Sequence, residues 1–241
     1  MTDLEIRPLR PDEIERFVRL SHYSFAGRPL EQRRADFAGR VTPRDVLVAF
    51  EDGEIVAQVM IYEFSYWLGG ARYPTGGLAN VVTAPEVARR GYASQMLRAT
   101  LKWMRDELGQ CLSTLYPTVY PLYQRLGWTL ADDSQHISGL PAAFRPNPLL
   151  PTDPGSRLVR RVATAADVDL LAPVYEAFAR ERSCYLDRPR WWWEARVLHL
   201  IHEQPSWLGL WYGSDGALAG YVVYYFEAGG NAHLHVGEVV A

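Results

Sequence analysis

The sequence predicts an α/β protein made of two tandem copies of one fold, each a mixed, mostly antiparallel sheet flanked by helices. The first observation is that one order of strand, helix, helix and hairpin occurs twice, on either side of a proline-rich segment. The second is that the two hairpin turns correspond, since Gly216 and Leu218 repeat Gly53 and Ile55 at one constant spacing. Such self-similarity indicates repeated structural units. The second copy is expected to be incomplete, because its pattern stops one strand after its hairpin.

The first copy is expected over residues 1–140 and opens with a short strand, a turn and a helix in "LEIRPLRPDEIERFVRLSHYSF". Asp12 is expected to cap this helix. One face of the helix carries Ile14, Phe17, Val18 and Ser21. "EQRRADFAGRV" predicts a second short helix, and "DVLVAFEDGEIVAQVMIYEF" predicts a hairpin, because two apolar runs meet at a Glu-Asp-Gly turn.

The remainder of the first copy alternates strands and helices. "GGLANVV" predicts a strand, and "ASQMLRATLKWMRDEL" predicts an amphipathic helix. The apolar stripe of that helix comprises Met96, Leu97, Leu101, Met104 and Leu108. "CLSTLYPT" predicts a strand, "VYPLYQRLGW" a short helix that ends at Gly127, and "WTLADDSQHISGL" a last strand.

A linker over residues 141–156 is predicted by the prolines of "PAAFRPNPLLPTDPGS". The second copy, residues 157–241, again reads as strand, turn and helix in "RLVRRVATAADVDLLAPVYEAFARER", then a helix in "RPRWWWEARVLHLI". "WLGLWYGSDGALAGYVVYYFEAGG" predicts its hairpin, and "HVGEVVA" resembles the strand "GLANVV". Because the pattern stops there, we interpret the sequence as a truncated version of a longer protein.

Composition narrows the class of protein. Hydrophobic residues make up 48% and charged residues 22%, as in soluble globular proteins, and the net charge of −3 disfavours nucleic-acid binding. The charged opening "MTDLEIRPLRPDEIERF" is not a signal peptide and no apolar run is long enough to cross a membrane, so we expect a cytoplasmic protein without a membrane partner. Cys111 and Cys184 are interpreted as buried, reduced thiols. His233 and His235 share a strand face without an evident third ligand, so no metal is expected.

Two arginines and a glycine stand where a strand gives way to a helix, in "VVTAPEVARRGYASQ". A helix that begins there exposes unpaired N–H groups and partial positive charge. Arg89 and Arg90 add full charges, while Gly91 and Ala93 let phosphate oxygens approach the backbone. The turn therefore predicts a pyrophosphate site, with an ordinary basic turn as the alternative. It matches neither the ATP-binding G-x-x-x-x-G-K-[ST] loop nor the NAD-binding G-x-G-x-x-G loop.

The element order of residues 1–140 resembles the GNAT N-acetyltransferase superfamily, and "VVTAPEVARRGYA" and "LYQRLGW" carry the resemblance. The pyrophosphate loop of that superfamily reads [QR]-x-x-G-x-[GA], from which residues 88–93 depart only at Ala88. The two-copy organisation is similar to the enhanced-intracellular-survival, or Eis-like, family of bacterial acetyltransferases. That family joins an active GNAT fold, a second GNAT fold without a working CoA loop, and a sterol-carrier-like domain that has no counterpart in this sequence.

The resemblance implies acetyl-CoA as cosubstrate, without a metal. The residues that would hold its pyrophosphate are Arg89, Arg90, Gly91, Tyr92, Ala93 and Ser94. The pantetheine arm would bond to Val81, Val82 and Thr83, and the N–H of Val82 would face the thioester oxygen. Thr118 and Val119 would contact the cofactor near its thiol.

Tyr123, in "LYQRLGW", falls where the superfamily keeps a tyrosine that protonates the departing thiolate. A phenol with a pKa of about 10 carries its proton at neutral pH. Tyr116 and Tyr120 are nearby competitors, and a plain packing role for Tyr123 is the other interpretation. The general base stays open between Glu63 and a water relay, because the resembled family supplies its base from the third domain.

The function implied by the resemblance is transfer of an acetyl group to a primary amine of a cationic acceptor. Aminoglycosides, polyamines and lysine-bearing peptides fit this description. His22 and Phe25 are expected to border the acceptor cleft, and self-association into a homo-oligomer is expected from the resembled family. The alternative function is a non-catalytic GNAT-like module that binds CoA or a protein.

Overall fold

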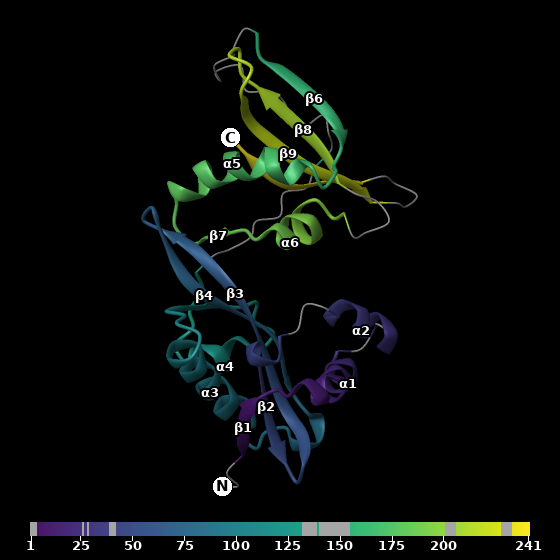
Figure 1. Cartoon of the computed structure of the whole chain (residues 1–241), viewed down its shortest axis with the longest axis vertical. Helices are drawn as coiled ribbons and strands as arrows, with labels where there is room; N and C mark the ends of the chain where they lie inside the picture. Colours follow the sequence, from purple (N-terminus) through teal and green to yellow (C-terminus); the bar gives the residue numbers. More distant parts are fainter. Residues whose placement is uncertain are drawn as a thin grey trace. The chain divides into compact units, whose positions relative to one another are not determined.

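The computed structural model describes residues 4–25, 27, 29–38, 42–131, 139, 155–200, 206–227 and 233–241. The chain divides into two compact units (Figure 1). Unit 1 comprises Met1–Ser65 and Tyr73–Leu130, and unit 2 comprises Tyr66–Arg72 and Ala131–Ala241. The predicted linker lies outside the described residues except for residues 155 and 156.

Unit 1 is built on a mixed, mostly antiparallel sheet, as predicted, and its strands follow the order β1–β2–β3–β4–β5. Its strands are β1 (Glu5–Pro8), β2 (Val46–Glu51), β3 (Glu54–Leu68), β4 (Ala71–Thr83) and β5 (Leu112–Thr114). β2 pairs antiparallel with β1 and β3, whereas β5 runs parallel to β4. The predicted hairpin is confirmed, and its turn residues Asp52 and Gly53 both have positive φ, 51° and 79°. Two such residues are what a tight turn between twisted strands requires.

β3 and β4 are much longer than the sequence predicted. The expected strand "GGLANVV" is only the second half of β4, and β4 follows β3 after Gly69 and Gly70, whose φ angles are 56° and 83°. The tip of this second hairpin, Tyr66–Arg72, belongs to unit 2. There the Trp67 side chain is 4% exposed and packs in one apolar cluster with Leu171 and Tyr175.

The helices of unit 1 lie on both sides of its sheet. Figure 1 shows α1 (Ile14–Ser24) and α2 (Leu30–Phe37) on one side, and α3 (Tyr92–Asp106) and α4 (Tyr120–Gln124) on the other. Three of the four residues of the predicted apolar face of α1 are buried, namely Phe17, Val18 and Ser21, whereas Ile14 is only half-buried and Leu20 is buried in addition. On α3 the predicted Met96, Leu97 and Met104 are buried, together with Tyr92 and Thr100. The predicted Leu101 is half-buried, and Leu108 lies beyond the end of the helix.

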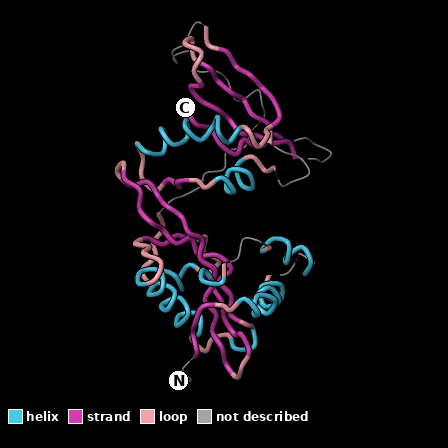
Figure 2. The backbone as a smooth tube through the Cα atoms, in the orientation of Figure 1, coloured by secondary structure: helices cyan, strands magenta, loops and turns pink. Residues whose placement is uncertain are grey.

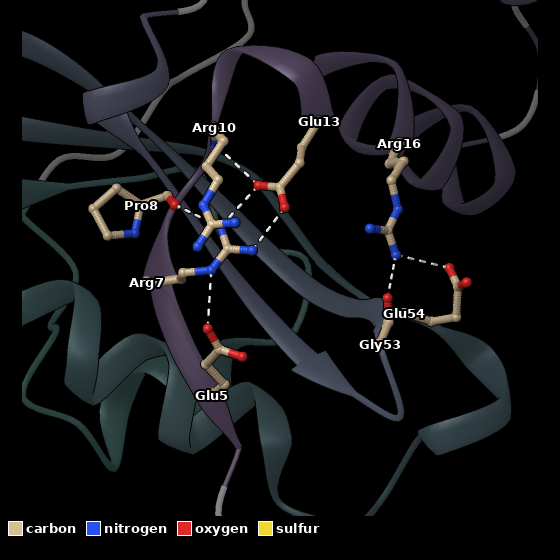
Figure 3. Close-up of polar contacts among 8 residues, drawn as sticks. All are labelled: Glu5, Arg7, Pro8, Arg10, Glu13, Arg16, Gly53 and Glu54. Carbon is tan, nitrogen blue, oxygen red and sulfur yellow. Dashed lines mark hydrogen bonds and ion pairs between the residues drawn. The ribbon is translucent and has the colours of Figure 1, made fainter.

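A carboxylate braces the junction between β1 and α1 (Figure 3). Glu13 accepts hydrogen bonds from the Arg10 N–H at 2.9 Å and from Arg7 Nη1 and Nη2 at 2.8 and 2.6 Å. The Arg7 guanidinium lowers the pKa of Glu13 to about 2. The predicted cap, Asp12, is therefore wrong: α1 is preceded by a 3-10 turn over Pro11–Glu13, and Glu13 satisfies the free backbone N–H.

Unit 2 repeats the strand, helix and hairpin order on an antiparallel sheet, β10–β9–β8–β6. The strands of this sheet are β6 (Arg157–Val162), β8 (Trp207–Tyr212), β9 (Leu218–Glu227) and β10 (His233–Val240), and the short strand β7 (Tyr185–Asp187) is not part of it. Figure 2 shows α5 (Asp167–Arg180) alongside this sheet. The predicted tryptophan-rich helix is short, because α6 (Arg190–Trp192) passes into a π-helical turn over Trp193–Val197.

Three sequence expectations fail or lie outside the structure. Cys111 and Cys184 are free but exposed rather than buried, because Cys111 precedes an edge strand and Cys184 occupies a tight turn with φ of 67°. Residues 128–131 form no strand, and most of the remaining predicted last strand of the first copy lies outside the described residues. His233 begins β10, but its side chain is outside the described set, and His235 stacks on Tyr225 with ring centroids 5.0 Å apart.

Candidate active site

The sheet of unit 1 opens where β4 loses its outer neighbour. β5 pairs with β4 only from Thr75 to Gly77, whereas β4 continues to Thr83. Among the described residues no strand pairs with the outer edge of β4 beyond Gly77. Backbone N–H and C=O groups along residues 78–83 are therefore available on that edge to a ligand that lies against it.

The direction of these groups follows from the hydrogen bond that ends the strand. The Ala84 N–H donates to the Val56 carbonyl of β3 at 2.8 Å. Because backbone groups alternate in direction along a strand, the N–H groups of Val81 and Thr83 point to the open edge, and that of Val82 points to β3.

The predicted anion turn is a backbone loop that begins α3. Arg89 has φ of 65°, and Gly91, at the N-cap of α3, has φ of 84°. The N–H groups of Ser94 and Gln95 both donate to the Gly91 carbonyl at 3.1 Å. In the described chain, no hydrogen bond involves the N–H groups of residues 89–93. Successive free N–H groups at a helix start form a concavity that suits an anion.

The two arginines of this loop have different surroundings. The Arg90 side chain, 53% exposed, pairs with Glu51 at the end of β2, with Nη1 and Oε2 3.2 Å apart. The Tyr92 hydroxyl donates to Oε1 of the same Glu51. These bonds tie the loop to β2, and hydrogen bonding raises the pKa of Arg90 above its usual value. Arg89 is exposed and has no side-chain partner within the described residues, so its guanidinium is available to a phosphate.

Tyr123 is a largely buried residue, 6% exposed, in α4. Its ring meets Trp128 edge-on, with the centroids 5.9 Å apart, and belongs to the same apolar cluster as Val82 and Tyr92. Burial raises the pKa of Tyr123 above its ordinary value of 10.0, so the phenol keeps its proton at neutral pH. In the described part of the chain its hydroxyl has no hydrogen-bond partner.

The competing tyrosines have less suitable environments. Tyr116 is 95% exposed. The Tyr120 hydroxyl accepts a hydrogen bond from the Leu130 N–H at 3.1 Å. Thr118 and Val119, the residues that precede α4, are both exposed, and Glu63 is an exposed residue of β3.

A polar group sits where α1 meets β4. Asn80 has φ of 50°, and its Oδ1 accepts a hydrogen bond from the fully buried Ser21 of α1 at 2.9 Å. Three buried polar atoms of β4 and of the last turn of α1 lack partners among the described residues: Asn80 Nδ2, Ser24 Oγ and His22 Nδ1. Phe25 follows on α1 and is 37% exposed. Left-handed backbone at a non-glycine residue stores local strain, which proteins often place at functional sites.

Two contributors were missed by the sequence reasoning. From the sequence, Glu51 is expected only as part of the hairpin turn. Nothing in the sequence pattern indicates that the end of β2 meets the start of α3. Asn80 carried a signal, because asparagine is depleted in strands and tolerates left-handed backbone. The described residues contain no cluster of three or more His, Cys, Asp or Glu side chains that could hold a metal, and none of their helices is long and apolar enough to span a membrane.

Comparison with known proteins places this geometry in a family. Two family models, each described as Acetyltransferase (GNAT) domain, match residues 5–131 and 184–241. The first covers more than half of the chain. None of the curated proteins matches the chain.

Solved structures agree in fold. A GCN5-related N-acetyltransferase from Anabaena variabilis has a TM-score of 0.75 at 19% identity, over 99% of this chain and 58% of that one. Eis1 from Mycobacterium abscessus has a TM-score of 0.72 at 21% identity, over 99% and 59%. A probable N-acyltransferase from Enterococcus faecalis has a TM-score of 0.71 at 22% identity, over 95% and 56%. At these identities the likeness establishes the fold alone, and this chain spans 56% to 59% of the length of the three proteins.

Proposed function

Since this chain belongs to the GNAT acetyltransferase family, we propose that unit 1 transfers an acetyl group from acetyl-CoA to a primary amine of a cationic acceptor. The observation that carries the proposal is the run of free N–H groups at residues 89–93, beside the open edge of β4. An anion cradle next to an unpaired strand edge suits a ligand that joins a pyrophosphate to an amide-containing arm.

The loop would hold the pyrophosphate mainly through its backbone. The free N–H groups of residues 89–93 and the positive end of α3 face the anion, and Arg89 supplies a mobile charge. Arg90 and Tyr92 keep the loop in place through Glu51. Ala93 and Ser94 in the first turn of α3, and Thr118 and Val119 before α4, stay proposals for cofactor contacts that the resemblance implies.

The open edge of β4 would hold the pantetheine arm and polarise the thioester. Acetyl-CoA supplies an activated acyl group whose carbonyl oxygen gains negative charge as the amine attacks. A backbone N–H aimed at that oxygen stabilises the charge. We assign this role to Val81 or Thr83 rather than to Val82, because the hydrogen bond of Ala84 directs the Val82 N–H toward β3.

Tyr123 would act as the general acid. The amine nitrogen bonds to the acetyl carbon, the carbon–sulfur bond breaks, and the sulfur takes the Tyr123 phenolic proton. The ammonium proton leaves to water, with Glu63 as the alternative base. Support comes from the raised pKa of Tyr123 and from its unpartnered hydroxyl within the described chain.

The acceptor would approach the side of β4 that faces α1. Asn80 of β4 and His22 and Ser24 at the end of α1 have buried polar atoms without partners among the described residues, and such atoms cost free energy unless a ligand satisfies them. Hydroxyl-rich and amine-rich molecules such as aminoglycosides and polyamines fit this lining, as does a lysine side chain.

Thiol release tests the proposal. The full chain is incubated with acetyl-CoA and a panel comprising an aminoglycoside, a polyamine and a lysine peptide, and free CoA is read with a thiol reagent. We expect release that depends on one of the amines and rises with pH as the amine loses its proton. CoA binding without release for any amine would favour the non-catalytic module, and neither binding nor release would refute both functions.

A further inference from the structure

Two strand positions inside the fold correspond between the units. Gln58 and Tyr221 are each the fifth residue after the hairpin glycine, and Asn80 and Glu238 hold the same place in "GLANVV" and "HVGEVV". The strand is irregular at the second position in both units, because Asn80 has φ of 50° and the register of β10 shifts immediately before Glu238. Glu238 lies opposite the buried Val223 of β9, so it points to the covered face of the sheet.

The first helix of each unit supplies a third corresponding position. Ser21 is the eighth residue after Glu13, and Tyr175 is the eighth residue after Asp167. Each of these carboxylates binds the arginine of the first strand in its unit, so the two helices start from the same landmark. Ser21 and Tyr175 are 0% and 4% exposed. Both side chains therefore turn inward at the same point of the helix.

In unit 1 these three positions form an incompletely bonded polar group. The Ser21 hydroxyl donates to Asn80 Oδ1 at 2.9 Å, and Gln58 Nε2 donates to the Phe17 carbonyl at 3.2 Å. Gln58 Oε1 and Asn80 Nδ2 are buried and lack partners among the described residues. Asn80 is also one of the residues that the proposed function places beside the acceptor.

In unit 2 a guanidinium lies among the same three positions. Arg188, between β7 and α6, donates to both oxygens of Glu238, with Nη1 and Oε1 2.8 Å apart. The Tyr221 hydroxyl donates to Glu238 Oε1 at 2.7 Å. The Arg188 guanidinium carbon lies 3.7 Å from the centroid of the Tyr175 ring and 4.9 Å from that of Trp193. A carboxylate and two aromatic rings thus enclose the cation, which is the chemistry that selects a guanidinium.

The enclosing side chains form what we call the cation cage: Tyr175, Trp193, Tyr221 and Glu238. Its walls are held by contacts that do not involve the cation. The Tyr175 hydroxyl donates to the Leu186 carbonyl at 2.8 Å, and the rings of Tyr175 and Trp193 meet edge-on with centroids 5.4 Å apart. Burial raises the pKa of Tyr221, so its hydroxyl keeps the proton that it donates to the carboxylate. The cage is therefore preorganised.

We propose that the cation cage is an acceptor-type cation site that unit 2 fills with its own Arg188, and that it accepts free guanidinium-type cations once this side chain is removed. The link between the cage and an acceptor rests on the proposed function. Because the planar fork pairs with both oxygens of Glu238 while it stacks on Tyr175, guanidinium fits better than ammonium. A cationic acceptor is thus excluded from unit 2 and is left with the corresponding positions of unit 1.

Thermal unfolding of the full chain in guanidinium chloride, compared with NaCl at equal ionic strength, tests the proposal. Arg188→Ala should unfold about 10 °C below the parent, because Glu238 loses its cation inside the fold. Guanidinium at about 20 mM should raise the unfolding temperature of this variant by about 3 °C, and it should not raise that of the parent. An Arg188→Ala variant that guanidinium does not stabilise overturns the proposal.

Two further variants show whether the effect comes from the cage. Arg190→Ala removes a neighbouring arginine whose partner Asp169 is exposed, and Arg188→Met fills the cage with an uncharged stem. Neither should respond to guanidinium, and a rise in either that equals the rise in Arg188→Ala overturns the proposal. If Arg188→Ala is unfolded in buffer, circular dichroism is followed during the same additions. Recovery of the helical signal supports the proposal, and a signal that stays absent overturns it.

Thiol release from acetyl-CoA with the amine panel is measured on the parent in parallel. Release by the parent, without a guanidinium response in Arg188→Ala, leaves the proposed function standing and overturns the cage. A guanidinium response without release by the parent supports the cage as a cation site and refutes the proposed function, so the two failures are distinct.

Discussion

Unit 1 and unit 2 join their first strand to their first helix with the same brace. In unit 1 Glu13 binds Arg7 and the Arg10 N–H, and in unit 2 Asp167 binds Arg161 and the Thr164 N–H. Burial raises the pKa of Asp167, but the bonds from Arg161 and Thr164 outweigh it and hold the pKa below its ordinary value. The side chains differ while the geometry recurs, so the junction is a property of the scaffold.

The candidate catalytic features of unit 1 lie outside this shared junction. The free N–H groups of residues 89–93 and the apolar stripe of α3 follow β4 in unit 1, outside the strand–helix junction that the two units share. The comparison teaches that the strand–helix junction belongs to the shared scaffold, whereas the candidate chemistry belongs to the segment that follows β4. If scaffold and site are separable, substitutions at the junction should change stability, and substitutions at residues 89–123 should change CoA binding or turnover.

Tyr123→Phe should have the largest effect. The ring and its contact with Trp128 remain while the proton donor is lost, so kcat should fall about 100-fold or more with CoA affinity unchanged. Steady-state thiol release and a CoA titration measure the two quantities. Tyr120→Phe is the control, and an equal loss in both variants would remove Tyr123 from the acid role.

The braces should matter next, and equally in both units. Glu13→Gln and Asp167→Asn each leave an arginine without its carboxylate, so each should lower the free energy of unfolding by about 2–4 kcal/mol. Urea unfolding measures this. Glu5→Gln, which removes only the exposed 3.0 Å contact to Arg7, should cost under about 1 kcal/mol. A loss in one unit alone would contradict the shared scaffold.

Substitution of Arg89 should weaken CoA binding more than substitution of Arg90. Arg89→Ala removes a charge that no described residue engages, so Kd should rise about tenfold. Arg90→Ala and Glu51→Gln should each raise Kd only about threefold, since they loosen the loop without removing that charge. Equal tenfold losses for Arg89→Ala and Arg90→Ala would show that Arg90 leaves Glu51 for the phosphate.

Acid should weaken the brace through Glu13. Its pKa falls from an ordinary 4.5 to about 2 in the folded state. Its contribution is therefore full above pH 4.5 and is lost as the pH falls from 4.5 toward 2. The stability of the parent should decline over this window, and Glu13→Gln should show a shallower decline. Identical slopes would mean that Glu13 is not ionised in the fold.

The sequence predicts elements well where periodicity is local. The β2–β3 hairpin, α1 and most of the α3 stripe follow from apolar spacing and turn residues. The full length of the β3–β4 hairpin was not predicted, because its turn at Gly69 and Gly70 lies inside a polar and aromatic stretch without the alternation of a half-buried strand. The cap of the first helix is Glu13 rather than Asp12, because the 3-10 turn lets the Glu13 carboxylate bind Arg7 of β1, a contact that local helix signals do not reveal.

The sequence indicates those parts of the candidate site whose residues are adjacent along the chain. Residues 89–93 follow one another along the chain, so a motif can reveal them. Glu51 contributes through tertiary placement alone, and no local pattern reports it. The direction of the Val82 N–H depends on which strand Ala84 pairs with, which spacing along one strand cannot tell.

Counting CoA sites tests the central claim most directly. Calorimetric titration of the full chain with CoA should give a single site per chain, and the double variant Arg89→Ala, Gly91→Val should abolish it by removing a charge and the residue that tolerates left-handed backbone. Two sites per chain, or a single site that the double variant retains, would contradict the assignment of the cofactor to the α3 loop.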